Sequence, residues 1–164
     1  MMEFRTTDLA EKKLVGNSLT MSFIENKTAQ LWGGFMPKVK EIPNKVGGER
    51  ISLQMYPNDF MEDPTLQFVK WALVEVTDFE NLPTELQKFN LTGGLYAVFP
   101  YKGNIVQAPV FFKKIFSEWI PASVYELDNS RPHFEIIPEG KYDPMDPDSE
   151  ETIYIPIKLK EKNS

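Results

Sequence analysis

The 164-residue chain nearly lacks the residue types that build disulfides and metal sites, with no cysteine and a single histidine, His133. Without cysteine there is no disulfide framework and none of the cysteine-bearing zinc patterns, and one histidine excludes histidine-rich metal sites. No apolar run approaches the roughly 20 residues that span a bilayer. The first residues, MMEFRTTDLAEKK, lack the apolar stretch of a signal peptide. We therefore expect a cytoplasmic protein without a metal site or membrane contact.

The common nucleotide and hydrolase motifs are also absent. There is no G-x-S-x-G, no phosphate loop and no dinucleotide fingerprint, so we expect no cofactor. The net charge of −6 and the pI of about 4.9 disfavour direct contact with nucleic acid, whose phosphates this field repels. An acidic stretch lacks the glycine and spacing of an EF-hand, and we interpret it as a solvated loop: Asp143, Asp146, Asp148, Glu150 and Glu151.

The composition fits one folded domain. Hydrophobic residues make up 41% and charged residues 26% of the chain, as in ordinary globular proteins. We expect an N-terminal extension at residues 1–14, one domain at 15–158 and a short tail at 159–164. The domain itself divides into half-repeats at about 15–80 and 91–158. Connecting loops are expected at 43–50, 58–69, 80–90 and 139–151, which are rich in proline, asparagine, glycine and acids.

An internal repeat supports that division. Apolar residues and a closing proline recur at identical relative places in two segments, Leu31, Trp32, Phe35, Met36, Pro37 and Ile115, Phe116, Trp119, Ile120, Pro121. Counted from Phe112, the apolar residues of the second segment follow the i, i+3, i+4, i+7, i+8 spacing of an amphipathic helix. We therefore predict helices at 28–42 and 108–121.

Short alternating segments resume after each helix, and they match between the halves at one constant offset. Residues 52–57 match 133–138, and 72–76 match 153–157. With leading strands around Leu19 and Leu95, the order β-α-β-β occurs twice. The predicted fold class is α+β, in which duplicated β-α-β-β units form an antiparallel sheet with two helices on one face and a ligand groove on the other.

The alternation also predicts which side chains face the helices. Phe134 and Ile136 are expected to face them, as ordinary core residues. The opposite face then carries aromatic residues around a few polar groups: Trp71, Tyr96, Tyr154, Tyr56, Gln54, Glu75, His133 and Glu135. An aromatic-lined face with few polar groups is typical of small-molecule pockets.

Several segments of the second half resemble one known family. These are Tyr96-Ala97-Val98-Phe99, Trp119-Ile120-Pro121, Tyr125-Glu126-Leu127-Asp128, Arg131-Pro132-His133-Phe134-Glu135 and Ile153-Tyr154-Ile155-Pro156-Ile157. They resemble the GyrI-like small-molecule-binding family, which includes effector domains of AraC-type and MerR-type regulators and the DNA gyrase inhibitory protein. The resemblance is strongest over residues 91–158, and the first half joins it through the repeat.

The resemblance implies a central pocket with aromatic walls and a buried glutamate that receives lipophilic cations. The matching acid is Glu135, with Glu75 as the rival candidate. The partner is then a small organic ligand, cationic and aromatic, because a flat cation offers charge to the acid and a face to the rings.

The ligand-binding candidates are Glu135, Trp71, Tyr96, Tyr154, Tyr56, Trp119 and His133. Trp119 lies in a helical apolar stripe, where core packing is the alternative. Residues 1–14 are too short for a helix-turn-helix, so we expect a stand-alone effector-binding domain.

Other interpretations remain open at this point. Glu135 and Glu75 can equally be solvated or paired with a lysine or arginine, such as Lys70 or Lys102 for Glu75. Some stand-alone members of the family are similar to hydrolases of strained cyclopropane compounds, which would make Glu135 a general base or nucleophile. A third interpretation is a protein-interaction module of the gyrase-inhibitor type, with a protein partner.

Overall fold

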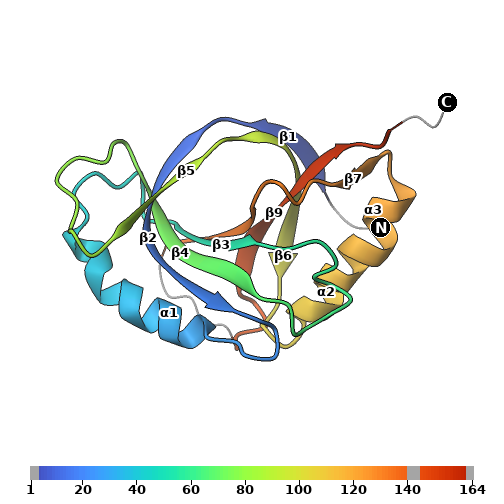
Figure 1. Ribbon diagram of the computed structural model, residues 1–164, viewed down its shortest axis with the longest axis horizontal. Helices are drawn as coiled ribbons and strands as arrows, with labels where there is room; N and C mark the ends of the chain where they lie inside the picture. Colours follow the sequence, from blue (N-terminus) through green and yellow to red (C-terminus); the bar gives the residue numbers. More distant parts are fainter. Residues whose placement is uncertain (1–3, 140–144, 162–164) are drawn as a thin grey trace.

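The computed structural model describes residues 4–139 and 145–161, which form nine strands and two helical segments (Figure 1). The strands are β1 (Arg5–Leu9), β2 (Lys12–Met21), β3 (Arg50–Met55), β4 (Phe68–Val76), β5 (Gln87–Leu91), β6 (Gly94–Lys102), β7 (Tyr125–Leu127), β8 (His133–Ile137) and β9 (Glu150–Leu159). Helix α1 (Thr28–Phe35) continues into a 3₁₀ turn (Met36–Glu41), and α2 (Ala108–Lys114) continues through a π-helical turn (Ile115–Trp119) into α3 (Ile120–Ala122). None of the described helices combines the length and the apolarity needed to cross a membrane.

The sheet is antiparallel throughout, in the order β1-β6-β9-β8-β3-β4-β2-β5, with β7 paired to β9. Only two residues separate β1 from β2, and both strands face the β5-β6 hairpin in one unbroken register. Leu9 lies opposite Gly94 and Lys12 opposite Leu91. The two ends of the strand order therefore meet, and the sheet bends into the ring seen in Figure 1. Both helical segments lie outside this ring.

The two halves of the chain are related by an approximate two-fold axis. Leu53 on β3 and Phe134 on β8 occupy equivalent places in the repeat, and they are also direct partners in the β3–β8 ladder. The same ladder pairs Ser52 with Glu135 and Gln54 with His133. An axis through the Leu53–Phe134 pair thus exchanges the halves. The ladder makes the repeat a feature of the fold as well as of the sequence.

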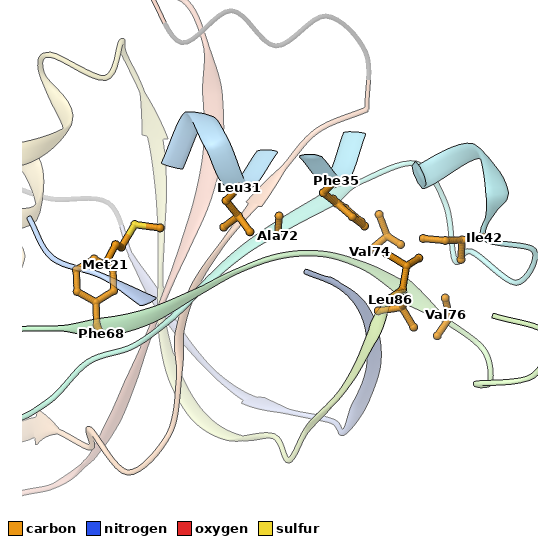
Figure 2. Packing of buried hydrophobic residues seen from close by; sticks show 10 residues of the cluster. Met21, Leu31, Phe35, Ile42, Phe68, Ala72, Val74, Val76 and Leu86 are labelled. Atoms are coloured by element: carbon orange, nitrogen blue, oxygen red, sulfur yellow. The ribbon is translucent and has the colours of Figure 1, made fainter. Parts of the chain in front are cut away.

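Three apolar clusters hold the sheet and helices together. Helix α1 buries Leu31 and Phe35 against one face of β4, where Ala72 and Val74 lie (Figure 2). The second helical segment packs in the same way on β6 and β9, through Ile115 and Ile120 on Ala97, Phe99, Ile153, Ile155 and Ile157. The third cluster fills the inside of the ring: Leu14, Ile51, Leu53, Leu73, Leu91, Tyr96 and Phe134, with Trp71 and Tyr154 packed against it.

The predicted α+β class, the two helices and their shared face of the sheet agree with this architecture. The predicted orientation of β8 is wrong. Phe134 and Ile136 point into the ring instead of towards the helices, and Glu135 pairs with Ser52 and Ile153 on the helix-covered face. The reason is that β8 is covered on both sides, so alternation alone does not identify its outer face. The face opposite the helices, where a groove was predicted, is packed with the third cluster.

Three strands were not predicted. β5 overlaps the segment 80–90, which was interpreted as a loop, and its side chains are mostly exposed. β1 lies within residues 1–14 and pairs with β6. β7 contributes three residues to the edge beside β9. Of the acidic stretch, Asp143 lies outside the described residues, Asp148 is 3.8 Å from Lys102 in an exposed ion pair, and Glu150 and Glu151 begin β9.

Candidate functional site

Buried polar side chains gather where the two halves meet. Of the four buried polar residues in the described chain, three lie at neighbouring positions of β3 and β8, namely Ser52, Gln54 and His133. Glu135, half-buried, lies on the same face two residues beyond His133. Buried polar groups are stable only when they are hydrogen-bonded or reserved for a ligand. This polar cluster, Ser52, Gln54, His133 and Glu135, is therefore the candidate functional site.

Gln54 connects the members of the cluster. With its amide in the orientation that satisfies both ends, Nε2 donates to Glu135 Oε2 at 3.0 Å and to the His133 carbonyl at 3.3 Å. Its Oε1 accepts from Ser52 Oγ at 3.0 Å. Gln54 is equivalent to Glu135 under the two-fold axis, so the amide and the carboxyl of the two halves meet across the β3–β8 pair.

The carboxyl of Glu135 is electrostatically strained. Its pKa is raised to about 8, chiefly by burial and then by the negative Glu151, while Lys70 and the Gln54 hydrogen bond act in the opposite direction. The residue keeps some accessible surface, yet protein atoms crowd the carboxyl closely enough for burial to dominate. Burial therefore favours the neutral, protonated form of the Glu135 carboxyl in the absence of a ligand.

Lys70 is the cation of this region. It lies on β4, in register opposite Gln54, and its Nζ donates to Thr28 Oγ1 at 3.2 Å, at the start of α1. Burial lowers the pKa of Lys70, while Glu135 and Glu151 raise it. Lys70 and Glu151 are again equivalent in the repeat, at the same offset that relates Gln54 to Glu135. The site thus holds two acids and one base around its axis.

Aromatic rings from three segments enclose His133. Tyr56 lies 5.0 Å from its ring, Phe60 5.6 Å and Phe116 5.9 Å, measured between centroids. Tyr56 and Phe60 stack at 4.3 Å with an interplanar angle of 5°, and Phe60 meets Phe116 edge-on at 5.5 Å. Burial, and secondarily the charge of Glu135, raises the pKa of Tyr56. Aromatic rings from both halves of the chain therefore surround His133, which lies two residues from Glu135 on β8.

His133 is neutral and incompletely hydrogen-bonded. Its Nε2 lies 2.7 Å from Asn129 Oδ1, whereas Nδ1 has no hydrogen-bond partner among the described residues. Burial lowers its pKa to about 3, which keeps the ring uncharged across the physiological range. An unpartnered buried acceptor costs about 1–3 kcal/mol, so this one calls for an explanation.

The structure divides the predicted site residues between three places. Tyr56, His133 and Glu135 come together in the polar cluster and its rings. A second group packs inside the ring, on the other side of the sheet, and consists of Trp71, Tyr96 and Tyr154. Tyr96 is fixed there by a hydrogen bond from its hydroxyl to the Pro132 carbonyl at 2.9 Å. Trp119 ends the π-helical turn of the second helical segment, and its ring packs against Phe99 and Tyr125.

The rival acid Glu75 has a different environment. It lies on β4, faces the inside of the ring and forms an ion pair with Lys12 at 3.2 Å. The predicted partners Lys70 and Lys102 bind elsewhere, to Thr28 and Asp148. Among the described residues, no group of three histidines or acids is arranged to hold a metal ion.

Five residues of the site and its surroundings were not singled out from the sequence: Ser52, Lys70, Phe60, Phe116 and Glu151, the last of which was interpreted as part of a solvated loop. The internal repeat contains the signal for Lys70, because its offset pairs Lys70 with Glu151 beside the Gln54–Glu135 pair. Phe60 lies in a segment interpreted as a loop. Phe116 lies in an apolar helical stripe that predicts core packing, which does not distinguish it from its neighbours.

The sequence is similar to a known protein family and to a transcriptional regulator. A family model described as the GyrI-like small molecule binding domain matches residues 2–158. The transcriptional regulator BrlR of Pseudomonas aeruginosa is 28% identical over 156 residues, which are 95% of this chain and 56% of that protein. The chain therefore spans about half the length of this curated relative.

Solved structures share the fold at low sequence identity. SAV2435 bound to tetraphenylphosphonium has a TM-score of 0.70 and 18% identity, covering 96% of this chain and 94% of that one. The EcmrR C-terminal domain has a TM-score of 0.74 and 12% identity, covering 98% and 99%. A hydrolase from Listeria innocua has a TM-score of 0.62 and 9% identity, covering 96% and 92%.

Proposed function

Because the chain belongs to the GyrI-like small molecule binding domain family, we propose that it binds amphipathic organic cations at the polar cluster around Glu135. The ligand's positive charge faces the Glu135 carboxylate, and its apolar part contacts the rings of Tyr56, Phe60 and Phe116. At neutral pH, loss of the Glu135 proton accompanies binding, because burial favours the neutral acid until a cation compensates its charge.

The environment of Glu135 is the single observation that carries this proposal. Its carboxyl is crowded by protein atoms, and among the described residues Gln54 is the hydrogen-bond donor to it. An acid kept this short of counter-charge is destabilised as an anion, and a cation restores the balance. Lys70 offsets the charges of Glu135 and Glu151 only in part, because the two acids share this one lysine, and a ligand cation supplies the missing positive charge.

The surrounding rings suit the apolar part of such a ligand. Aromatic faces attract cations by about 0.5–2 kcal/mol and bury hydrocarbon surface at the same time. Phe60 is 4% exposed and stacks on Tyr56, where a flat ligand ring would find the same kind of contact. The neighbouring structure of SAV2435 contains tetraphenylphosphonium, a lipophilic cation, and this supports the choice of ligand class.

Equilibrium titrations test the proposal. Tetraphenylphosphonium serves as the cation and triphenylphosphine oxide as a neutral relative. We expect Glu135→Gln to weaken binding of the cation about tenfold or more, which corresponds to about 1.4 kcal/mol, while the neutral compound changes little. Glu75→Gln is the matched control, because Glu75 is also a strand acid but is already paired with Lys12. Equal losses for both compounds would contradict the proposal.

Hydrolysis is a second candidate function, favoured by one local observation. Glu135 influences the pKa of the buried Tyr56, so an acid and a phenol act on each other at the same place. Such a pair can move a proton to or from a small bound molecule. Incubation with an electrophilic cyclopropane compound, followed by mass spectrometry, distinguishes the two functions. A turnover that Glu135→Gln abolishes would support catalysis, and recovery of intact compound supports binding alone.

A further inference from the structure

Nδ1 of His133 is a buried acceptor to which no residue in the described part of the chain donates a hydrogen bond. The side chain is 2% exposed. The three rings around the imidazole, those of Tyr56, Phe60 and Phe116, lie 5.0 to 5.9 Å away between centroids, and the two phenylalanines have no donor to offer. Nδ1 therefore belongs to the member of the polar cluster that is buried among aromatic rings.

The other ring nitrogen determines which proton His133 carries. Nε2 lies 2.7 Å from Asn129 Oδ1, and an amide oxygen only accepts, so Nε2 holds the hydrogen and donates it. In a neutral imidazole Nδ1 then has a lone pair and no hydrogen. The pKa of about 3, lowered by burial, keeps the ring in this neutral form. What Nδ1 lacks is a hydrogen-bond donor.

The position of His133 relative to Glu135 indicates where that donor comes from. The two residues are two apart on β8, so their side chains leave the same face of the strand, with backbones about 6.6 Å apart along it. Two acceptors that share one tetrahedral ammonium nitrogen lie about 5 Å apart when each hydrogen bond is near 2.9 Å. Side chains that lean slightly towards each other meet this requirement.

We propose that the site takes primary and secondary ammonium groups, with one N–H donated to the Glu135 carboxylate and a second N–H to Nδ1 of His133. The inference rests on the proposed binding of cations at Glu135 and narrows the ligand class within it. Tertiary ammonium ions have one N–H and satisfy Glu135 only. Quaternary ions bind through charge and ring contacts alone.

A methylation series of one amine tests this count of hydrogen bonds. The probes are 2-naphthylmethylammonium ions with two, one and no N–H groups, that is, the N-methyl, N,N-dimethyl and N,N,N-trimethyl forms, measured at one pH. In the unaltered chain we expect the two-donor ion to bind about fivefold to tenfold more tightly than the one-donor ion. In His133→Phe, which keeps an aromatic ring in place, this ratio is expected to fall to about one.

A matched control and a second measurement make the test independent of folding. Tyr154→Phe alters a polar aromatic residue on the other face of the sheet and should leave the ratio unchanged. Because His133 is the only histidine, its two ring nitrogens give the only imidazole signals in a nitrogen-15 spectrum. We expect the Nδ1 signal to shift on adding the two-donor ion and to stay in place with the trimethyl ion.

The outcomes separate this inference from the proposed function. If the two-donor and one-donor ions bind equally to the unaltered chain, or if His133→Phe keeps the preference, the role of His133 is refuted while cation binding at Glu135 stands. An unmoved Nδ1 signal would refute it as well. If none of the three ions depends on Glu135, the proposed function itself is wrong.

Discussion

Gln54 and Glu135 are equivalent residues of the two half-repeats, and their side chains hydrogen-bond to each other across the strands where the halves meet. A duplicated fold brings equivalent positions together at its axis, so one changed residue there creates an asymmetric site. In this chain the second half contributes His133, Glu135 and Glu151, whereas the first contributes Ser52, Gln54 and Lys70. The titratable acids of the site thus come from the second half alone.

The stability of the protein is expected to fall as pH rises from about 6.5 to about 8. Below pH 6.5 the buried neutral His133, whose pKa is lowered to about 3, acts in the opposite direction to Glu135. The folded-state pKa of Glu135 is about 8, above its ordinary value of 4.5, so the folded state holds a proton that the unfolded state releases. The slope attributable to this group is at most about 1.4 kcal/mol per pH unit, and it ends above pH 8. Chemical denaturation at several pH values measures it.

Two variants isolate that effect. Glu135→Gln cannot titrate and should lose this part of the slope, whereas Glu75→Gln, whose acid is paired with Lys12, should keep it. If the free energy of unfolding changed with pH in the same way in all three proteins, Glu135 would titrate as a free acid. The conclusion that protein atoms crowd its carboxyl would then be wrong.

Lys70→Met is expected to tighten binding of a permanent cation at pH 9. The ammonium of Lys70 competes with the ligand for the same acids and helps to ionise Glu135, whose pKa it lowers. Its removal leaves the site more negative once Glu135 is ionised, and it moves the pH midpoint for binding upwards. Calorimetric titration with tetraphenylphosphonium checks both effects. Lys12→Met, which removes the partner of Glu75, is the control. Weaker binding by Lys70→Met at pH 9 would contradict the idea that Lys70 competes with the ligand for the acids.

Phe60→Ala is expected to destabilise the protein by about 3 kcal/mol, as for other buried phenylalanines. The ring is 4% exposed and packs on Tyr56, Phe116 and His133, so it joins the two halves. Phe23→Ala is a suitable comparison because Phe23 also contacts Tyr56 but is 43% exposed. We expect a loss below about 1 kcal/mol there. Similar losses of stability in the two variants would show that the packing of Phe60 on residues of both halves contributes little.

The sequence predicts much of this fold because its repeat is regular. The constant offset between the halves identifies β3 with β8 and β4 with β9, and the apolar stripes identify both helices. It does not predict β5, whose residues Gln87–Leu91 are mostly exposed and include only Phe89 and Leu91 as apolar residues packed on the inside of the ring. Backbone pairing of a polar strand leaves little trace in side-chain patterning.

The site was predicted in part, for a similar reason. Glu135, His133 and Tyr56 were identified and do lie together, but they were grouped with Trp71, Tyr96 and Tyr154, which pack on the other face. In β8 both faces are covered, so apolar and polar residues do not separate inside from outside. The β3–β8 register, with Leu53 opposite Phe134, supplies the missing information.

The pH dependence of tetraphenylphosphonium binding tests the central claim most directly. The cation has no titratable group, so any change in affinity reports the protein. If Glu135 must lose its proton to receive the ligand, affinity rises by roughly tenfold or more between pH 6 and pH 9 and levels off near the pKa of about 8. Glu135→Gln should show a flat profile. An unaltered chain whose affinity stays constant over this range would contradict the account.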